Sequence, residues 1–182
     1  MATTTPLHFS HQAPSLTDPT TTACYNLALQ TFDSIPSFDP PSWQRRLTAE
    51  NARLFTASSS PPSPPTSNSP SATASNTNPI PGFLLTSVRQ HPELPAPTFH
   101  ISIAAVDAAY RGRGVFPRML AMAEAYCRDE LGLGSVTICT YPERFPGMWR
   151  LLGDAKNGWV EVGWRETGDG RQVLMERGVS GG

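Results

Sequence analysis

The sequence predicts an α/β fold with a mixed, mostly antiparallel sheet flanked by helices. A long amphipathic helix pattern over 114–131 lies between two strand-like runs, which is typical of this class. Two alternating runs, 158–166 and 171–179, predict a pair of strands around the turn TGDG. Because 182 residues suffice for one hydrophobic core, we expect residues 1–182 to form a single domain.

The first third of the chain predicts four short elements. Asp18 is a typical N-cap residue, and Pro19 suits the first helical position, where no backbone N–H is needed. Ser42 is expected to cap a second helix. In order, we expect a strand at 7–10, a helix at 17–32, a helix at 42–52 and a strand at 54–58.

Residues 59–81 are crowded with proline and serine and carry almost no apolar side chains. Such a segment cannot bury enough surface to offset the entropy lost on ordering, so we predict that it is disordered. A strand-like run at 82–90 follows directly, which makes the segment an insertion in a hairpin loop. Loop closure becomes only slowly less favourable with length, so the fold tolerates this insertion.

The second half predicts alternating strands and helices. A strand is expected at 98–106, and Gly132 ends the long helix that follows it. A buried strand at 135–141 and a short helix at 145–153 come before the final pair of strands. The apolar stripe of the long helix consists of Phe116, Leu120, Ala123, Cys127 and Leu131.

The stretch AAYRGRGVFPRML, residues 108–120, joins the strand at 98–106 to the long helix. Unpaired N–H groups and the helix dipole make such a turn a general anion site. Gly112 and Gly114 permit close backbone approach and positive φ. An ordinary tight turn with two solvated arginines is the alternative, because the stretch matches neither a P-loop nor a dinucleotide fingerprint.

The motif Arg111-Gly112-Arg113-Gly114-Val115-Phe116 resembles the signature of the GCN5-related N-acetyltransferase (GNAT) superfamily, Arg/Gln-x-x-Gly-x-Gly/Ala. The preceding AAVDAAY and the late GWVEVG are also similar to family patterns, and the order of elements matches. The resemblance implies a three-layer fold whose central strands splay apart.

The resemblance also implies that the chain binds acetyl-CoA and transfers its acetyl group to an amine by direct attack in a ternary complex. The pyrophosphate would lie on the backbone amides of Arg111, Gly112, Arg113, Gly114, Val115 and Phe116. The pantetheine arm would pair with the backbone near Ala105 and Val106, and the Val106 N–H would stabilise the oxyanion.

Two positions depart from the family pattern. Phe116 stands where the family has glycine or alanine, and the fourth helix lacks the tyrosine that protonates the departing thiolate in many members. Tyr141 is the nearest substitute, Cys139 is a weaker one, and the thiolate could also leave unassisted.

A general base would take a proton from the acceptor ammonium. His100 and Glu143 are the main candidates, beside Asp107 and Glu161. A packed or surface histidine is the alternative for His100, and a charge at a helix N-terminus is the alternative for Glu143.

Composition limits the remaining possibilities. The formal net charge of −1 gives no overall attraction to nucleic acid or to an anionic membrane, and no apolar run reaches the length of a membrane span. Three widely spaced cysteines predict neither a metal site nor a disulfide framework, so we expect a protein of the cytoplasm or nucleus.

The acceptor is expected to be a small-molecule or peptide amine, and the protein a monomer or homodimer. Two rival functions remain open. One is a non-catalytic GNAT-fold protein that binds CoA or serves in interactions. The other is a nucleic-acid-binding module that uses Arg111, Arg113 and the WQRR helix at 43–46, although a solvated helix face is the simpler interpretation of WQRR.

Overall fold

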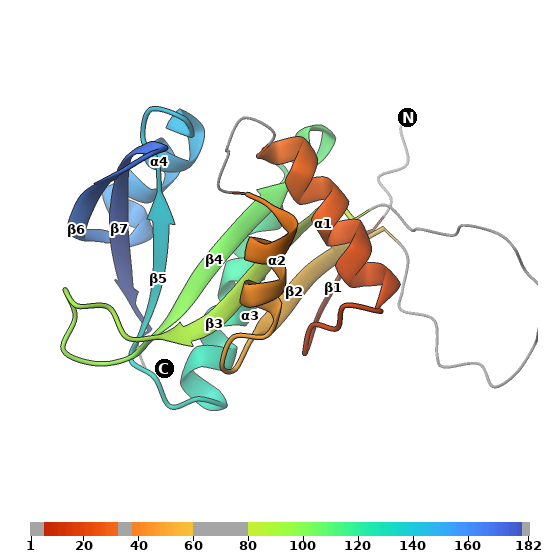
Figure 1. Cartoon of the computed structure of the whole chain (residues 1–182), viewed down its shortest axis with the longest axis horizontal. Coiled ribbons are helices and arrows are strands. Elements are labelled where there is room, and N and C mark those ends of the chain that lie inside the picture. The colour runs from red at the N-terminus through yellow and green to blue at the C-terminus, as the bar shows by residue number, and fades with distance from the viewer. Residues whose placement is uncertain (1–5, 33–37, 60–79, 180–182) are drawn as a thin grey trace, which may run out of the picture.

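The computed structural model describes residues 6–32, 38–59 and 80–179. These residues form seven strands, four α-helices and two short 3₁₀ helices (Figure 1). The strands are β1 (His8–Gln12), β2 (Arg53–Ser58), β3 (Gly82–Arg89), β4 (Thr98–Val106), β5 (Ser135–Thr140), β6 (Val160–Thr167) and β7 (Gly170–Gly178). The helices are α1 (Pro19–Thr31), α2 (Pro40–Leu47), α3 (Val115–Asp129), α4 (Pro146–Gly153), η1 (Ala108–Tyr110) and η2 (Ala155–Asn157).

All seven strands join one sheet in the order β1-β2-β3-β4-β5-β7-β6. Every neighbouring pair is antiparallel except β4 and β5, which are parallel. Helices α1 and α2 cover one face, and α3 crosses the other (Figure 1). The predicted α/β fold with a mixed, mostly antiparallel sheet in three layers is therefore confirmed.

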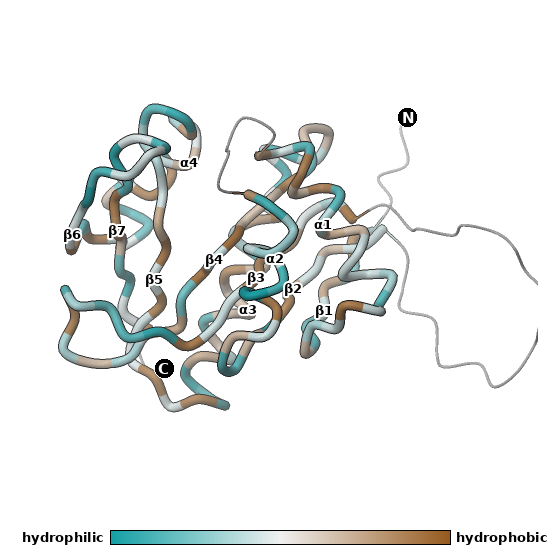
Figure 2. The backbone as a smooth tube through the Cα atoms, viewed as in Figure 1, coloured by the Kyte–Doolittle hydropathy of each residue, from teal (hydrophilic) through white to brown (hydrophobic). Residues whose placement is uncertain are grey.

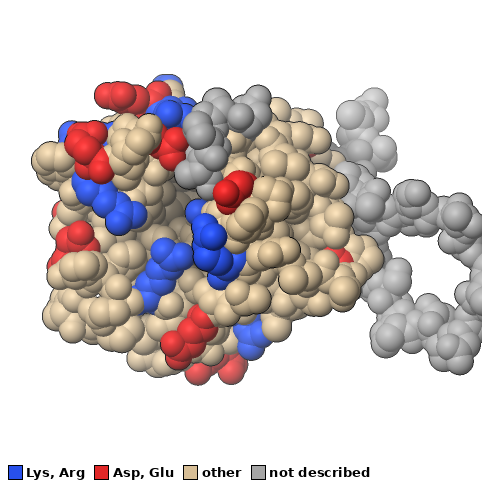
Figure 3. Space-filling model, in the orientation of Figure 1, with Lys and Arg blue, Asp and Glu red and all other residues tan. Residues whose placement is uncertain are grey.

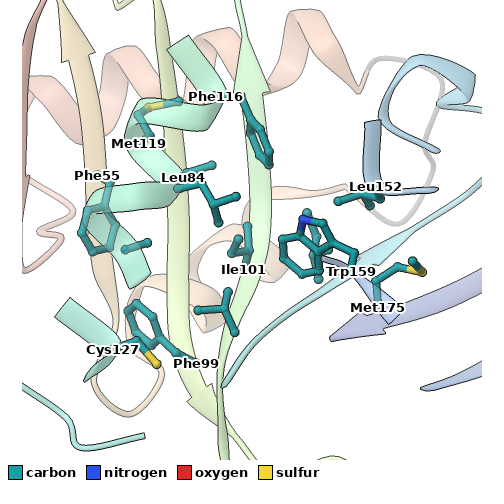
Figure 4. Packing of buried hydrophobic residues seen from close by; sticks show 14 of the residues in the cluster. Phe55, Leu84, Phe99, Ile101, Phe116, Met119, Cys127, Leu152, Trp159 and Met175 are labelled. Atoms are coloured by element: carbon teal, nitrogen blue, oxygen red, sulfur yellow. The ribbon is translucent and has the colours of Figure 1, made fainter. Parts of the chain in front are cut away.

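Each face of the sheet has its own hydrophobic core, and Figure 2 shows the apolar segments concentrated along the central strands. The α3 core lies between the sheet and α3 and extends to α4, and Figure 4 shows its packing. Its members include Phe55, Leu84, Phe99, Ile101, Phe116, Met119, Leu152 and Trp159. The α1/α2 core includes Cys24, Leu27, Trp43, Leu47, Phe83, Leu85, Ile103 and Ala105.

The first helix begins as predicted, because the Asp18 carboxylate accepts a hydrogen bond from the Thr20 N–H at 2.9 Å. The predicted start of the second helix is wrong. Asp39, not Ser42, caps α2, and its carboxylate accepts the Ser42 N–H at 2.7 Å. Pro40 then occupies the first turn, where its missing N–H breaks no helical bond. The helix ends at Leu47, five residues before the predicted end at 52.

Strands β2 and β3 pair antiparallel, so the expected hairpin is present. The predicted insertion, 59–81, connects these strands, and its residues 60–79 lie outside the described part of the chain. Its disorder therefore stays a prediction. Within the described residues, no helix is long and apolar enough to cross a membrane. The same residues contain no group of three or more histidine, cysteine or acidic side chains that could hold a metal ion.

Candidate active site

The parallel strands β4 and β5 pair over only a short length. Their register runs from Phe99 opposite Val136 to Ile101 opposite Ile138. Beyond that point, β4 continues to Val106 and β5 to Thr140 without mutual pairing. The two central strands thus diverge toward their carboxyl ends, which is the predicted splay.

A β-bulge in β4 lies where this divergence begins. Ile101 pairs with Thr86 and Ile103 with Leu85, so Ser102 is an extra residue without a partner position on β3. One inserted residue moves the following side chains to the opposite face. Ile101 accordingly packs in the α3 core, whereas Ile103 packs in the α1/α2 core. The bulge therefore reverses the sheet face that each β4 side chain after Ser102 occupies, at the point where β4 and β5 diverge.

The backbone of β4 also presents free groups to the splay. The Asp107 N–H donates to the Pro81 carbonyl at 2.9 Å, beside β3. Because N–H groups alternate in direction along an antiparallel strand, those of Ala104 and Val106 point away from β3, toward the divergence. The Arg111 Nε donates to the Val106 carbonyl at 3.2 Å, which confirms the direction of that peptide edge.

The turn into α3 lies beside this strand end. Gly112 and Gly114 have φ of 73° and 74°, a region that favours glycine, and Gly114 is the N-cap of α3. In the described chain no acceptor is found for the N–H groups of Gly112, Gly114, Val115 or Phe116. A Cβ placed on either glycine would meet no atom within 4 Å. The turn therefore offers several N–H groups without a partner in the described chain, and the space beside its two glycines is open.

A cleft of about 1070 Å³ passes through the divergence and joins the turn to the opposite face of the sheet. Its described lining comes from β4, β5, the turn that includes η1, α3, α4 and the residues between β5 and α4, together with residues of α1, α2, β3, β6 and β7. The polar residues among them are Thr31, Arg46, Arg89, His100, Ser102, Tyr110, Arg111, Thr140, Tyr141, Arg144, Arg165 and Gln172.

Solved structures share this architecture. An acetyltransferase of the GNAT family from Staphylococcus aureus Mu50 matches with a TM-score of 0.58 and 14% sequence identity, over 95% of this chain and 100% of that one. An aminoglycoside 6'-N-acetyltransferase complexed with coenzyme A matches with a TM-score of 0.58 and 10% identity, over 95% and 98% of the two chains.

The chain has the GNAT fold. Nourseothricin acetyltransferase matches more partially, with a TM-score of 0.50 and 17% identity over 71% of this chain, which spans 66% of that longer one. Neither a protein-family model nor a curated protein matches the chain by sequence. The resemblance predicted from the motif at 111–116 is thus confirmed at the level of the fold.

The GNAT fold brings most of the predicted cofactor residues to the cleft. Val106, Arg111, Gly112, Gly114, Val115 and Phe116 all line it. Ala105 does not, because the bulge turns its side chain into the α1/α2 core, and Ala104 lines the cleft instead. Arg113 also lies outside, with its guanidinium 5.4 Å from the centre of the Tyr110 ring.

The residue that departs from the GNAT signature, Phe116, has a buried ring. It packs in the α3 core with only 7% of its surface exposed, and Figure 4 shows it beside β4. Its backbone N–H belongs to the first turn of α3 and remains available to a ligand. The large side chain is therefore accommodated by the core without removing the donor.

Two of the three predicted catalytic side chains line the cleft. Tyr141 lies directly after β5, and its Oη accepts a hydrogen bond from Gln172 Nε2 at 3.0 Å. This leaves the Tyr141 hydroxyl proton free to be donated elsewhere. Glu143 is exposed and does not line the cleft, although Arg144 and Phe145 directly after it do.

His100 lines the cleft but is buried, with 4% of its surface exposed. Its Nδ1 lies 3.1 Å from Thr137 Oγ1, and His91 Nε2 lies 3.3 Å from the same oxygen. Burial, followed by the positive charge of Arg89 and neighbouring groups, lowers the pKa of His100 well below 6.5. An imidazole of such low pKa binds a proton weakly, so these surroundings favour a packing role over that of a base.

We expect His100 to make stability depend on pH. Its folded pKa lies below its unfolded value, so the unfolded chain binds more protons as pH falls below 6.5. The contribution of His100 to the free energy of unfolding is therefore fully present above pH 6.5. It is lost as the pH falls, by up to about 1.4 kcal/mol per pH unit. Urea unfolding between about pH 5 and about pH 7.5 measures it. His100→Gln should make the free energy of unfolding less dependent on pH, whereas His8→Gln on edge strand β1 should leave the pH dependence unchanged. Equal pH profiles for the two variants would refute the contribution of His100.

Several cleft residues escaped the sequence-based prediction. Ser102 carries no motif signal, because a bulge depends on pairing with another strand. Gln172 and Thr140 belong to ordinary alternating strand patterns. Arg46 lies in the WQRR helix predicted to be solvated, but it is only half-exposed, whereas its neighbour Arg45 is exposed. Helical spacing from the α1/α2 core residue Trp43 could have separated these two arginines.

Proposed function

We propose that this chain transfers an acetyl group from acetyl-CoA to a primary amine. The observation that carries the proposal is the divergence of β4 and β5 beside the amino end of α3, where free N–H groups meet a cleft. Backbone donors at a helix N-terminus suit a pyrophosphate. The coenzyme A complex of an aminoglycoside acetyltransferase with the same fold supports this choice of ligand.

The residues present fit such a ligand. Ala104 and Val106 offer a strand edge to an extended amide chain such as the pantetheine arm, while Gly112 and Gly114 leave space for phosphate oxygens. Ser102 Oγ and Thr140 Oγ1 are buried without a hydrogen-bond partner in the described chain, although both residues line the cleft. Buried polar groups are normally paired, so these hydroxyls suit a polar ligand at the splay.

The chain supplies two groups for acyl transfer. The neutral amine nitrogen forms a bond to the thioester carbon and the C–S bond breaks. The nitrogen loses its proton to water, and water returns to the tyrosine the proton that the tyrosine gives to the thiolate. We assign the Val106 N–H to the carbonyl oxygen, where negative charge develops. We assign Tyr141 to protonation of the leaving thiolate, since its hydroxyl proton is not used by Gln172. Holding both reactants in the cleft supplies much of the acceleration.

Binding is tested by thermal unfolding with acetyl-CoA. At a hundredfold excess over Kd, a ligand of the native state stabilises it by about 2.7 kcal/mol, so Tm should rise by several degrees. Gly114→Trp should abolish this rise, because its indole projects from the turn into the space that the pyrophosphate needs. Absence of any Tm rise in the wild type would contradict the proposal.

Gly132→Trp is the matched control. Gly132 has φ of 63°, and a Cβ added to it would meet nothing within 4 Å, as at Gly114, but it lies past the far end of α3. Both variants carry the same backbone strain, so both should lower the Tm of the free protein. Only Gly114→Trp should remove the rise in Tm caused by acetyl-CoA. If both variants lost the rise, general destabilisation of the protein would explain the loss, and the turn at Gly114 would not be identified as the binding site.

A non-catalytic CoA-binding protein is the second candidate. It is favoured by the position of Glu143 outside the cleft and by the lowered pKa of His100, which leave no conventional base among the described residues that line the cleft. Thermal stabilisation by acetyl-CoA without thiol release in the presence of any amine would support it. Thiol release that depends on an amine would support the enzyme.

We further propose that residues 1–182 form one domain, as a monomer or homodimer, in a reducing compartment such as the cytoplasm or nucleus. Cys24, Cys127 and Cys139 are free thiols in the structure. Burial raises the pKa of Cys127 to about 11, so its reactive thiolate is scarce at neutral pH. These thiols are typical of a protein that needs no disulfide.

A further inference from the structure

The cleft has an unusual charge balance. Of its described lining residues, five are arginines and none is aspartate or glutamate. Figure 3 shows Lys and Arg side chains gathered around the hollow between α2 and the part of the sheet formed by β5, β7 and β6. The five are Arg46, Arg89, Arg111, Arg144 and Arg165.

Two of these arginines have evident roles. Arg111 belongs to the turn before α3 and donates to the Val106 carbonyl. Arg144 donates to the Asp169 carbonyl at 2.6 Å and lies 3.8 Å from its carboxylate. The other three come from α2, β3 and β6, far apart in sequence, and we call Arg46, Arg89 and Arg165 the arginine cluster.

The three side chains of the arginine cluster lie near His100. His100 lies at the base of this side of the cleft, and the charges of Arg89, Arg46 and Arg165 all help to lower its pKa. Burial and the neighbouring Arg89 likewise lower the pKa of Arg46 from its ordinary value. Three cations thus line one cleft, and Arg46 and Arg89 repel each other, which an anion bound between them would relieve.

No ion pair within the described chain neutralises this charge. No carboxylate of the described residues lies within 4 Å of a nitrogen of the arginine cluster. Arg46 donates to the Ser42 hydroxyl, and Arg165 Nε donates to Gln172 Oε1 at 2.8 Å, so both partners are neutral. The nearby carboxylate of Asp39 raises the pKa of Arg46, but it caps α2 through the Ser42 N–H.

We propose that the acceptor is a small amine that also carries an anionic oxygen group, a carboxylate or a phosphate, which Arg46, Arg89 and Arg165 bind together. This inference rests on the proposed acetyl transfer and names its substrate class. The guanidinium group matches both anions through paired N–H donors. A polycationic amine would instead meet like charge on several sides.

The same charges also solve the problem of the missing base. A primary amine must lose its proton before it can attack the thioester, and like charge nearby disfavours the ammonium form. The arginine cluster therefore lowers the pKa of an amine that enters the cleft, so more of it is neutral at pH 7. The anionic group offsets the repulsion and keeps the acceptor bound while its amine is unprotonated.

Matched acceptors test the proposal with the full chain. We would compare 4-aminobutanoate with butylamine and phosphoethanolamine with ethanolamine, and would include spermidine as a polycation. Thiol release from acetyl-CoA gives kcat/KM for each. At least one anionic acceptor should exceed its uncharged counterpart by about tenfold or more, the range of a charge-assisted hydrogen bond. The pair with the larger ratio of kcat/KM, anionic acceptor over counterpart, shows whether the site prefers a carboxylate or a phosphate. Ratios near one in both pairs, or a higher kcat/KM for spermidine, would overturn the proposal.

Substitutions assign the effect to the arginine cluster. Arg89→Gln and Arg165→Gln each remove an exposed cation, so folding should be retained, and each should raise KM for the better anionic acceptor about fivefold to tenfold. Arg45→Gln is the matched control, because Arg45 is an exposed neighbour on α2 that does not line the cleft. The KM for acetyl-CoA should stay the same in all three. An equal rise of KM in Arg45→Gln would overturn the assignment.

Failure of the proposed function has a different signature. If acetyl-CoA neither stabilises the protein nor releases thiol, acetyl transfer is refuted, and calorimetric titration with 4-aminobutanoate and phosphoethanolamine alone still tests the anion site. Binding to the wild type that is lost in Arg89→Gln/Arg165→Gln supports that site, and no binding refutes it. Acetylation of uncharged amines only would refute the anion site while leaving acetyl transfer intact.

Discussion

Replacement of Tyr141 by phenylalanine should lower kcat about a hundredfold, the usual contribution of a positioned general acid. The tyrosine lines the cleft just beyond the end of β5, where the two central strands have separated. Its oxygen accepts from Gln172 Nε2, so its own proton can point toward the thiolate. Steady-state thiol release measures kcat, and thermal unfolding with acetyl-CoA should show that binding is unchanged.

Tyr126→Phe is the matched control for the loss of a hydroxyl. The Tyr126 Oη accepts from Arg53 Nε at 2.7 Å and does not line the cleft, so kcat should stay within about twofold of the wild type. Gln172→Leu should keep the Tyr141 hydroxyl but remove the hydrogen bond that orients it. Its kcat should lie between the values of Tyr141→Phe and Tyr126→Phe. An unchanged kcat in Tyr141→Phe would show that the thiolate leaves without protonation.

The sequence predicted the cofactor half of the site better than the acceptor half. The turn at 111–116 carries its chemistry in consecutive residues, so strand, glycines and helix could be recognised together. Local patterns of this kind survive folding because their geometry is set by neighbouring residues. Acetyl-CoA binding at this turn nevertheless rests on the proposed function.

The acceptor half depends on contacts between distant segments. Arg46, Arg89 and Arg165 lie in three elements, and no spacing in the sequence shows that a splayed sheet brings them together. The bulge at Ser102 is hidden for a similar reason, since it exists only relative to β3. That bulge also explains why Ala104 replaces Ala105 in the cleft: strict alternation along β4 fails beyond it.

Local competition explains the error at α2. Both Asp39 and Ser42 are good N-cap residues, and two prolines separate them. Proline is favoured in the first helical turn, so a cap before Pro40 allows the helix to include both prolines. Trp43 and Leu47 of this helix pack in the α1/α2 core, and Arg46 lines the cleft.

The second large effect is expected at Phe116, where the chain departs from the GNAT signature. Phe116→Ala should lower the free energy of unfolding by about 3 kcal/mol, because truncating a buried phenylalanine removes apolar contacts and leaves a cavity. The ring lies in the α3 core, where Met119 and Leu152 are fully buried. Urea unfolding of the free protein measures the loss. The affinity for acetyl-CoA should change by less than about threefold, since the backbone N–H remains.

Leu29→Ala on α1 is the control, because Leu29 is 40% exposed and its truncation should cost less than about 1 kcal/mol. The two readouts separate two roles for Phe116. A large loss of stability with unchanged affinity means that the ring replaces core volume and that the pyrophosphate contacts the backbone alone. A large loss of affinity with little loss of stability would mean that the ring itself contacts the ligand, which its burial in the α3 core argues against.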